Sequence, residues 1–364
     1  MTDGKIDPWG AVDIGKYDKN FEQFGVKRFP DEWKQKLDHH LFRRGIIIAH
    51  RDFEKVVEKI QNKKPFIMMT GIATSGYMHF GHKSIVDLVK FFKSKGAKTY
   101  FGIADIDAYC SRTDDKVPNL QTAKEFAVNN LANVLALGLT KKDVYIQSRM
   151  PSRYYEFTFE LSKKITASTF EGIYGHLDLG KISANLLQYA DILHPQLEEF
   201  EGKMPSVTPV GMDQDPHMRA VRDLVHRLKY PMELPSSIYP AHEPGLKEGV
   251  KMSSSLPESA IFLTDSPEVA KAKVMKAFSG GQVTAEEHKK LGGNPDVDRA
   301  YQLLKYHHPD DKKVEKLYHD FKSGALLSGD MKEICAEFLV KFLKEHNAKY
   351  KKFEPVARKM IFGE

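Results

Sequence analysis

Short apolar runs alternate with segments of helical spacing through the first two thirds of the chain. This alternation is typical of an α/β protein. Apolar runs predict buried strands at residues 66–69, 99–105, 143–147 and 207–210. Helices are predicted over 118–137, 153–165, 182–193 and 217–228, whereas 168–180, which contains three glycines, is predicted to be a loop. We therefore expect a Rossmann-type parallel sheet, with ligands at the carboxyl ends of its strands.

The last third of the chain has an entirely helical pattern, with helices predicted over 267–278, 296–307, 312–323 and 329–347. The last of these has one clear apolar stripe. Its members are Met331, Ile334, Cys335, Phe338, Leu339, Phe342 and Leu343. The sequence thus predicts a catalytic domain over 65–265, with a helical insertion at about 113–205, and an all-helical domain over 266–364.

Residues 1–64 form a predicted N-terminal extension. It begins with a turn at 7–10 (DPWG), followed by a charged helix over 33–41. A short apolar strand lies between basic ends at 43–52, and an amphipathic helix follows over 53–60. Residues 62–65 then lead into the first core strand.

Composition narrows the class of protein. The chain has 364 residues, of which 41% are hydrophobic and 29% charged, as in ordinary globular proteins. No run of 18 apolar residues predicts a membrane span. The first ten residues are acidic and polar, unlike a secretory signal, and the two cysteines lack partner motifs. We expect a cytoplasmic protein, and the net charge of +6 permits a polyanionic partner without requiring one.

Candidate chemistry begins where the first core strand gives way to a helix. Ser75 is followed by His79-Phe80-Gly81-His82. The two imidazoles lie one turn apart and can donate hydrogen bonds to phosphate oxygens, and the helix start offers free backbone N–H groups. Gly81 would let a flat ligand lie against the backbone. Alone, the motif favours a histidine pair at an ordinary helix cap, because short motifs recur by accident.

Two later loops supply partners for this motif. Residues 211–214 (GMDQ) follow the fourth predicted strand, and 251–255 (KMSSS) lie in a polar loop. One lysine and three hydroxyls can wrap a triphosphate, although KMSSS alone could be a flexible surface loop. Because all three motifs occur in this order, each in a loop, they favour a nucleotide site together.

These motifs resemble those of the class I aminoacyl-tRNA synthetases, and among them the tryptophanyl family of archaeal and eukaryotic type. HFGH and KMSSS look like the two class motifs, and GMDQ is similar to the loop that holds the ATP ribose and the amino acid's ammonium group. DPWG, FRRGIIIAHRDF at 42–53 and LTDSP at 263–267 strengthen the resemblance, while YADIL at 189–193 is closer to the bacterial type. Ser254 departs from the pattern, since the family often has a second lysine there.

The resemblance implies a set of substrates and residues. ATP, Mg²⁺, L-tryptophan and tRNA(Trp) are the expected ligands, a homodimer is the expected assembly, and the helical domain is expected to read the anticodon. His79, His82 and Lys251 are the expected catalytic residues. ATP is expected to contact Ser75, His79, Gly81, His82, Gly211, Asp213, Gln214, Lys251, Met252, Ser253, Ser254 and Ser255. The amino acid is expected to contact Met69, Gly71, Asp107, Gln188, Asp191 and Gln214.

The choice of amino acid depends on Asp191. Indole N–H is only a donor, so it needs an acceptor such as this carboxylate. A tyrosine hydroxyl would satisfy Asp191 equally, and tyrosyl enzymes of similar design place an aspartate here. Met69 favours tryptophan, since archaeal tyrosyl enzymes have a tyrosine at that position. The tyrosine and glutamine that read indole in eukaryotic tryptophanyl enzymes are here Met69 and Gly102.

Three alternatives remain open at this stage: a tyrosyl enzyme, a small-molecule nucleotidyltransferase and a tRNA-binding paralogue without activity. The lysines after residue 330 bear on the choice. They form either a solvated face or a surface for nucleic-acid phosphate. The basic residues of this segment are Lys332, Lys341, Lys344, Lys349, Lys351, Lys352, Arg358 and Lys359.

Overall fold

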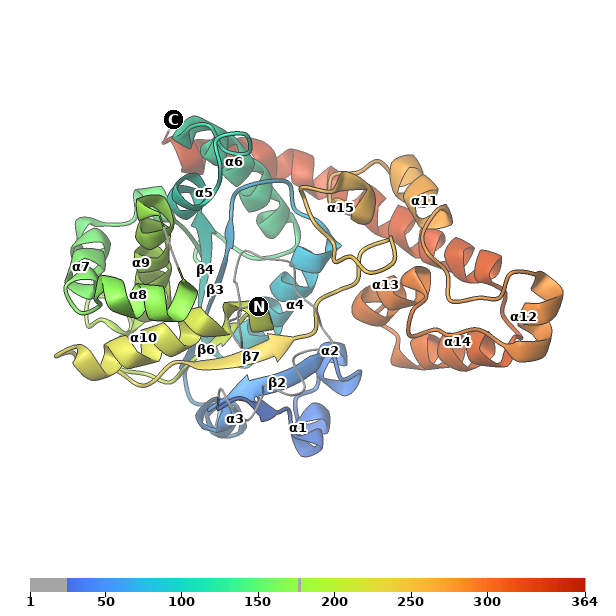
Figure 1. The fold of residues 1–364 in the computed structure, drawn as a ribbon, viewed down its shortest axis with the longest axis horizontal. Helices are drawn as coiled ribbons and strands as arrows, with labels where there is room; N and C mark the ends of the chain where they lie inside the picture. Colours follow the sequence, from blue (N-terminus) through green and yellow to red (C-terminus); the bar gives the residue numbers. More distant parts are fainter. Residues whose placement is uncertain (1–24, 176–177, 364) are drawn as a thin grey trace.

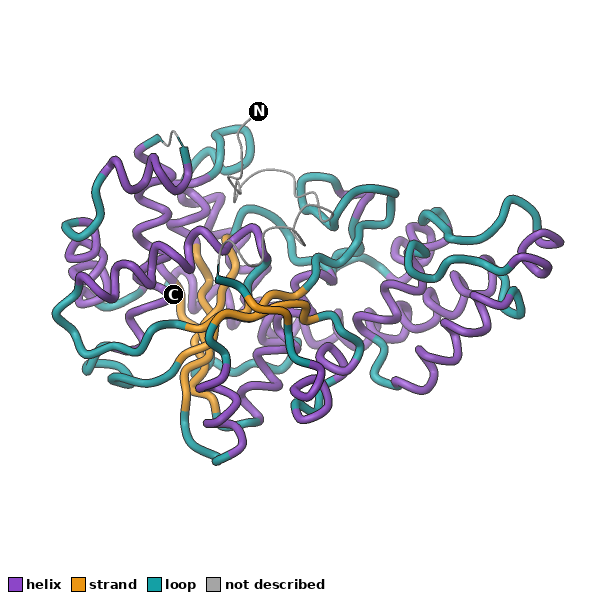
Figure 2. Tube along the Cα trace, turned by 60° about the horizontal axis from the view of Figure 1, so that its bottom comes forward, coloured by secondary structure: helices purple, strands orange, loops and turns teal. Residues whose placement is uncertain are grey.

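A central sheet organises the structure, which is a computed structural model that describes residues 25–175 and 178–363. The turn expected at 7–10 lies outside these residues. The described residues form a seven-stranded sheet of order β1-β2-β7-β6-β3-β4-β5. Figure 2 shows its strands at the centre, with helices to either side. The expected Rossmann-type sheet is confirmed, because five neighbouring strands, β7-β6-β3-β4-β5, pair in parallel.

The parallel strands are β3 (Phe66–Ala73), β4 (Ala97–Ala104), β5 (Val144–Ile146), β6 (Ser206–Pro209) and β7 (Ser236–Pro240). The first four confirm the predicted core strands. β7 was not predicted, because Ser236, Ser237 and the prolines at 235 and 240 leave no run of apolar residues at this strand. Two antiparallel strands of the N-terminal segment extend the edge at β7: β1 (Lys27–Arg28) and β2 (Ile47–Arg51).

Helices cover the sheet and continue into the C-terminal part (Figure 1). The N-terminal segment has α1 (Asp31–Lys36), α2 (His40–Arg43) and α3 (Glu54–Gln61). Around the sheet lie α4 (Phe80–Ser94), α5 (Asp105–Ser111), α6 (Leu120–Ala136), α7 (Ser152–Ser162), α8 (Ala167–Tyr174), α9 (Leu179–Leu193) and α10 (Asp215–Arg227). The C-terminal part has α11 (Pro267–Met275), α12 (Ala285–Leu291), α13 (Arg299–His307), α14 (Asp311–Ser323) and α15 (Ser328–Phe362).

Two predictions in the first half of the chain are wrong, one of a loop and one of a helix. The loop predicted at 168–180 contains α8, which begins where the side chain of Thr166 accepts the Thr169 N–H and which buries Phe170. The single helix predicted over 33–41 is two helices, because Leu37 leaves helical geometry to enter the core and extended His39 begins α2.

The predicted end of the last helix at residue 347 is also wrong. α15 continues through Pro355 to Phe362. Its second half packs along α6, where Asn129 donates to the Tyr350 hydroxyl at 3.2 Å and Arg358 pairs with Glu125 at 2.7 Å. These contacts offset the hydrogen bond that proline removes. The predicted apolar stripe is confirmed, since Met331, Cys335, Leu339 and Leu343 are buried.

One hydrophobic core joins the sheet to the C-terminal helices. It runs without a break from Phe66 and Phe92 beside the sheet to Phe321 and Leu339 in the helical part. The domain boundaries therefore remain predictions from the sequence. Among the described residues, no helix is both long enough and apolar enough to cross a bilayer.

Candidate active site

The loop from β3 to α4 places the first motif at the carboxyl end of the central strand. Extended His79 begins α4, and its backbone N–H donates to Nδ1 of His82 at 3.2 Å. The two imidazoles stack with their centroids 3.9 Å apart. A Cβ at Gly81 would lie 3.0 Å from Cε1 of His79, so a larger residue here would require the His79 ring to shift by a few tenths of an ångström.

Both imidazoles are neutral donors near pH 7. Burial lowers the pKa of His82 to about 4. Burial, His82 and the Lys251 ammonium lower that of His79 well below its usual value. Since Nδ1 of His82 accepts a hydrogen bond, its proton lies on Nε2. The positive charge at this site must therefore come from lysine rather than histidine.

The KMSSS loop folds back onto the start of α4. The hydroxyl of Ser254 donates to the carbonyl of Tyr77 at 3.0 Å, and a Cβ on Gly76 would lie 2.6 Å from Cβ of Ser254. The chain after the loop pairs with the first motif, because Phe80 N–H donates to Ile261 O at 3.0 Å. Residues far apart in sequence thus lie side by side at the start of α4.

Inside the KMSSS loop the residues have different exposures. Met252 is 5% exposed and anchors the loop in the core, whereas Lys251 and Ser255 are exposed. Ser253 and Ser255 hydroxyls lie 2.9 Å apart. Lys251 and Ser255 are therefore accessible to a ligand, while Met252 holds the loop in place.

The GMDQ motif forms a short turn, η5 (Met212–Gln214), after β6. Nε2 of His242 lies 3.2 Å from Oδ1 of Asp213. Burial opposes the charge of Asp213, but His242 and Lys251 hold the pKa of this carboxyl below its usual value. A Cβ on Gly211 would lie 2.2 Å from Oδ1 of Asp213, so only glycine leaves room for the turn.

A second, deeper group of polar residues surrounds Asp191 on α9. This carboxylate is 5% exposed and accepts from the Tyr154 hydroxyl at 2.7 Å and from Nε2 of Gln147 at 2.9 Å. Burial raises the pKa of Asp191 to about 7, although these hydrogen bonds oppose the rise. Gln147 also accepts the backbone N–H of Asp107 at 2.7 Å. Burial raises the pKa of Asp107 to about 6.

Two glycines lie side by side in the sheet next to this network. Gly71 on β3 and Gly102 on β4 are register partners, and Gly102 is in turn the partner of Tyr145 on β5. The Tyr145 side chain folds over Gly102, where a Cβ would lie 2.6 Å from its hydroxyl oxygen. Burial and the neighbouring charge of Asp191 raise the pKa of Tyr145. A tyrosine from the next strand thus covers the position that has no side chain.

The predicted site residues fall into two connected groups. Ser75 accepts from Nε of Arg112 at 3.2 Å near the start of α4, and Met69 is buried in the cluster around Tyr154. Gln188 donates to Oε1 of Gln214 at 3.4 Å, which joins the deeper group to GMDQ. Their roles stay predictions.

Sequence reasoning missed several partners: Arg112, Tyr145, Gln147, Tyr154 and His242. A buried carboxylate such as Asp191 needs donors, and that need was the only available signal. It does not say which donors the fold supplies.

Divalent metal can be tested against the donor set. Among residues 25–175 and 178–363, the histidine, cysteine and carboxylate side chains form no group of three that could hold a metal ion. Mg²⁺ commonly keeps several waters and binds mainly through substrate phosphates. The donor set therefore suits Mg²⁺ carried on a nucleotide and not a site built only from protein ligands.

Comparisons with known proteins agree with this arrangement. The family model described as tRNA synthetases class I (W and Y) matches residues 61–344. A curated tryptophan–tRNA ligase of Aeropyrum pernix is 41% identical over 371 aligned positions, covering 99% of both chains. The crystal structure of tryptophanyl-tRNA synthetase from the same archaeon has a TM-score of 0.87 at 41% identity and covers 98% of each chain. A relative from Saccharomyces cerevisiae, named tryptophan–tRNA ligase, cytoplasmic, is 33% identical and covers 100% of this chain and 89% of its own.

Proposed function

Because the chain belongs to the class I tRNA synthetases for tryptophan and tyrosine, we propose that it is a tryptophan–tRNA ligase. It activates L-tryptophan with ATP and transfers the aminoacyl group to tRNA(Trp). The observation that carries this function is full-length similarity to tryptophan–tRNA ligases in a chain where Lys251 of KMSSS interacts electrostatically with both His79 and Asp213. The tyrosyl alternative has less support, since the relatives described above carry the tryptophan name.

The first step is attack of the tryptophan carboxylate on the α-phosphate of ATP, which releases pyrophosphate. Such a reaction needs positioning and charge stabilisation more than covalent catalysis. His79 and His82 donate neutral N–H groups to phosphate oxygens, together with the free N–H groups at the start of α4. Lys251 supplies the positive charge, and the serines of its loop close over the phosphates. Asp213 and Gln214 face the ribose side.

The amino acid occupies the deeper group. The indole lies against Met69 and the open backbone of Gly71, with its N–H directed at Asp191. A carboxylate has lone pairs beyond those used by Tyr154 and Gln147, so Asp191 can accept this third donor. Gln188 and Gln214, which contact each other, face the ammonium and carboxylate of the substrate, and Asp107 lies on the ammonium side.

Mg²⁺ accompanies ATP in this proposal and neutralises charge on the phosphates. The proposal also includes a homodimer in the cytoplasm. The homodimer is proposed from the resemblance to the family; two large apolar side chains of the helical insertion are exposed and available to a second copy, Phe159 on α7 at 76% and Leu179 on α9 at 81%. The cytoplasmic name of the yeast relative supports the compartment.

The tRNA contacts are assigned to the C-terminal part. Its helical domain, proposed over 266–364, reads the anticodon. Most of the lysines at the end of α15 are exposed and available to phosphate, among them Lys349, Lys351, Lys352 and Lys359. Arg358 instead pairs with Glu125, and Lys332 donates to the carbonyl of Met275.

Aminoacylation tests the proposal. Labelled tryptophan should be attached to a tRNA(Trp) transcript in the presence of ATP, whereas tyrosine with a tRNA(Tyr) transcript should give no charging. Charging of tRNA(Tyr) with tyrosine would replace the proposal with the tyrosyl alternative. Binding of tRNA without any charging would favour the inactive paralogue.

A further inference from the structure

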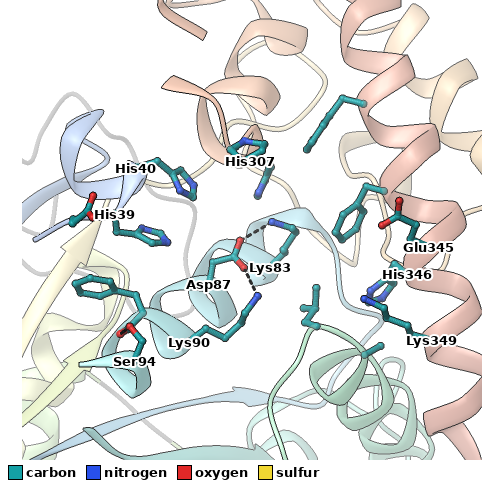
Figure 3. Close-up of a pocket in the computed structure, with 17 residues that line it drawn as sticks. His39, His40, Lys83, Asp87, Lys90, Ser94, His307, Glu345, His346 and Lys349 are labelled. Carbon is teal, nitrogen blue, oxygen red and sulfur yellow. Dashed lines mark hydrogen bonds and ion pairs between the residues drawn. The ribbon is translucent and has the colours of Figure 1, made fainter. Parts of the chain in front are cut away.

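A cavity of about 610 Å³ lies behind the first motif, between α4, the α2 segment, the end of α13 and α15. Its volume is in the range of small-molecule sites. Figure 3 shows four imidazoles around a lysine–aspartate–lysine group on α4. None of the roles proposed above uses these residues. We propose that this rear cavity binds a phosphate-class oxyanion: inorganic phosphate, pyrophosphate or a small phosphate monoester.

The charge balance of the cavity favours an anion. On α4, Asp87 lies 2.6 Å from Nζ of Lys83 and 3.5 Å from Nζ of Lys90, so one carboxylate faces two ammonium groups. The other nearby aspartate, Asp38, is already paired with Arg43 at 2.6 Å. At the rim, exposed Glu345 and Lys349 on α15 offset each other. The enclosed part therefore has an excess of one positive charge.

One buried hydrogen-bond donor has no acceptor. Nε2 of His307 contacts both carboxyl oxygens of Glu243, at 2.9 and 3.0 Å. The His307 side chain is 4% exposed, and within the described part of the chain its Nδ1 has no hydrogen-bond partner. Buried polar atoms without partners are rare in folded proteins. Because His307 lines the cavity, an oxyanion there can supply the missing acceptor.

The protonation of this pair makes Nδ1 a donor. Burial raises the pKa of Glu243, against the charge of Lys83, and lowers that of His307, which favours forms of the pair without net charge. With either Glu–COOH and neutral histidine or carboxylate and imidazolium, Nε2 and the carboxyl group share one proton. When the shared proton comes from the carboxyl group, or when the ring is an imidazolium, a second proton lies on Nδ1. A ligand at this atom must therefore accept a hydrogen bond, as phosphate oxygens do.

The other three imidazoles at the cavity are His39, His40 and His346, and His39 provides a further hydrogen-bond donor. Nδ1 of His39 accepts the Leu41 N–H at 3.3 Å, which leaves its proton on Nε2. His40 and His346 use Nε2 on Tyr306 O and Asn133 Oδ1, so in the neutral rings their Nδ1 atoms carry a lone pair and no proton. Burial is the main reason that the pKa of all three lies at about 4. A bound anion would favour the protonated forms, in which every ring nitrogen donates.

The cavity is coupled by contact to the candidate active site. Lys83 directly follows His82 on α4. The ring of Phe80, between the two motif histidines, packs on His307 with centroids 4.9 Å apart. The rear cavity therefore lies against the back of the same helix start, separate from the KMSSS loop. The proposal does not depend on which amino acid the protein uses.

Isothermal titration calorimetry of the full chain with inorganic phosphate, and separately with pyrophosphate, tests this site. Lys90→Gln should weaken phosphate binding about tenfold, since it removes one charge-assisted contact from a partly exposed lysine. His307→Gln should also weaken it, because glutamine can still bond Glu243 but lacks the Nδ1 donor. Lys344→Gln is the matched control on the outer face of α15 and should bind phosphate like the unchanged chain.

Lys251→Ala separates the rear cavity from the proposed active site: it should weaken only the phosphate binding that belongs to the KMSSS loop, and the binding that Lys90→Gln weakens should persist in it. Equal loss of binding in Lys90→Gln and Lys344→Gln would overturn the proposal, as would loss of all phosphate binding in Lys251→Ala or the absence of any phosphate binding in the unchanged chain. Melting temperatures of all variants show whether the fold is retained. If His307→Gln does not fold, Lys90→Gln against Lys344→Gln still decides the question.

Discussion

Replacing Gly102 by alanine should damage tryptophan binding specifically. The added methyl group would lie 2.6 Å from the hydroxyl oxygen of Tyr145 and 2.8 Å from its Cζ, closer than real Cβ contacts. An ordinary contact of roughly 3.5 Å requires the ring to move by about 1 Å. Tyr145 cannot move freely, because His194 packs edge-on against it with centroids 5.2 Å apart. Overpacking of this kind costs about 1–3 kcal/mol.

If the displaced ring reaches the indole pocket, this cost corresponds to a rise of about 5- to 150-fold in KM for tryptophan. The assay is tryptophan-dependent ATP–pyrophosphate exchange, in which KM for ATP should stay within about twofold. Gly329→Ala at the start of α15 is the matched control, because a Cβ there meets nothing within 4 Å. Its kinetics should match those of the unchanged chain.

A double substitution tests the cause of the effect. In a Tyr145→Val chain, which lacks the ring, the further change Gly102→Ala should have little additional effect on KM for tryptophan. An unchanged KM in the single Gly102→Ala variant would refute the proposed pocket. Equal rises for tryptophan and ATP would show that the substitution acts on the whole site and not on the indole.

Three further outcomes are expected. Lys251→Ala should lower the rate of adenylate formation at least tenfold and change tryptophan affinity little, as measured by single-turnover kinetics and equilibrium binding; a large loss of affinity would contradict its phosphate role. Because the pKa of Asp191 is raised to about 7, its carboxylate gains a proton as pH falls through this value, so KM for tryptophan should rise below pH 7 and Asp191→Asn should remove that step. Asp215→Ala should destabilise the protein by about 3–5 kcal/mol in urea denaturation. The Arg51 guanidinium lies 2.7 Å from this carboxylate and would stay buried without it. A change below about 1 kcal/mol would mean that Tyr239 or water replaces the carboxylate.

Contiguous motifs were the part of the site that the sequence could reveal. HFGH, GMDQ and KMSSS each combine glycine or serine with charged or hydrogen-bonding groups over four or five residues, and each follows a strand or lies in a loop. The apolar runs before them also predicted β3 and β6 correctly. Contacts between motifs, such as Ser254 with Tyr77, could not be predicted because they depend on how the KMSSS loop folds back.

The amino-acid pocket shows the opposite case. Tyr145 covers Gly102 only because β4 and β5 pair in one register. Gln147 reaches both Asp191 and the start of α5 from a short segment with no motif of its own. Local patterns also failed where packing decides structure: α8 buries Phe170 despite its glycine-rich surroundings, and contacts with α6 carry α15 through Pro355.

The central claim is that one phosphate site and one indole pocket together activate tryptophan. Amino-acid-dependent ATP–pyrophosphate exchange, with tryptophan and tyrosine measured side by side on the same preparation, tests it most directly. We predict exchange with tryptophan and none above background with tyrosine. Exchange with tyrosine alone would keep the phosphate chemistry and overturn the assignment of Asp191 to an indole, and exchange with neither would contradict the proposed activity.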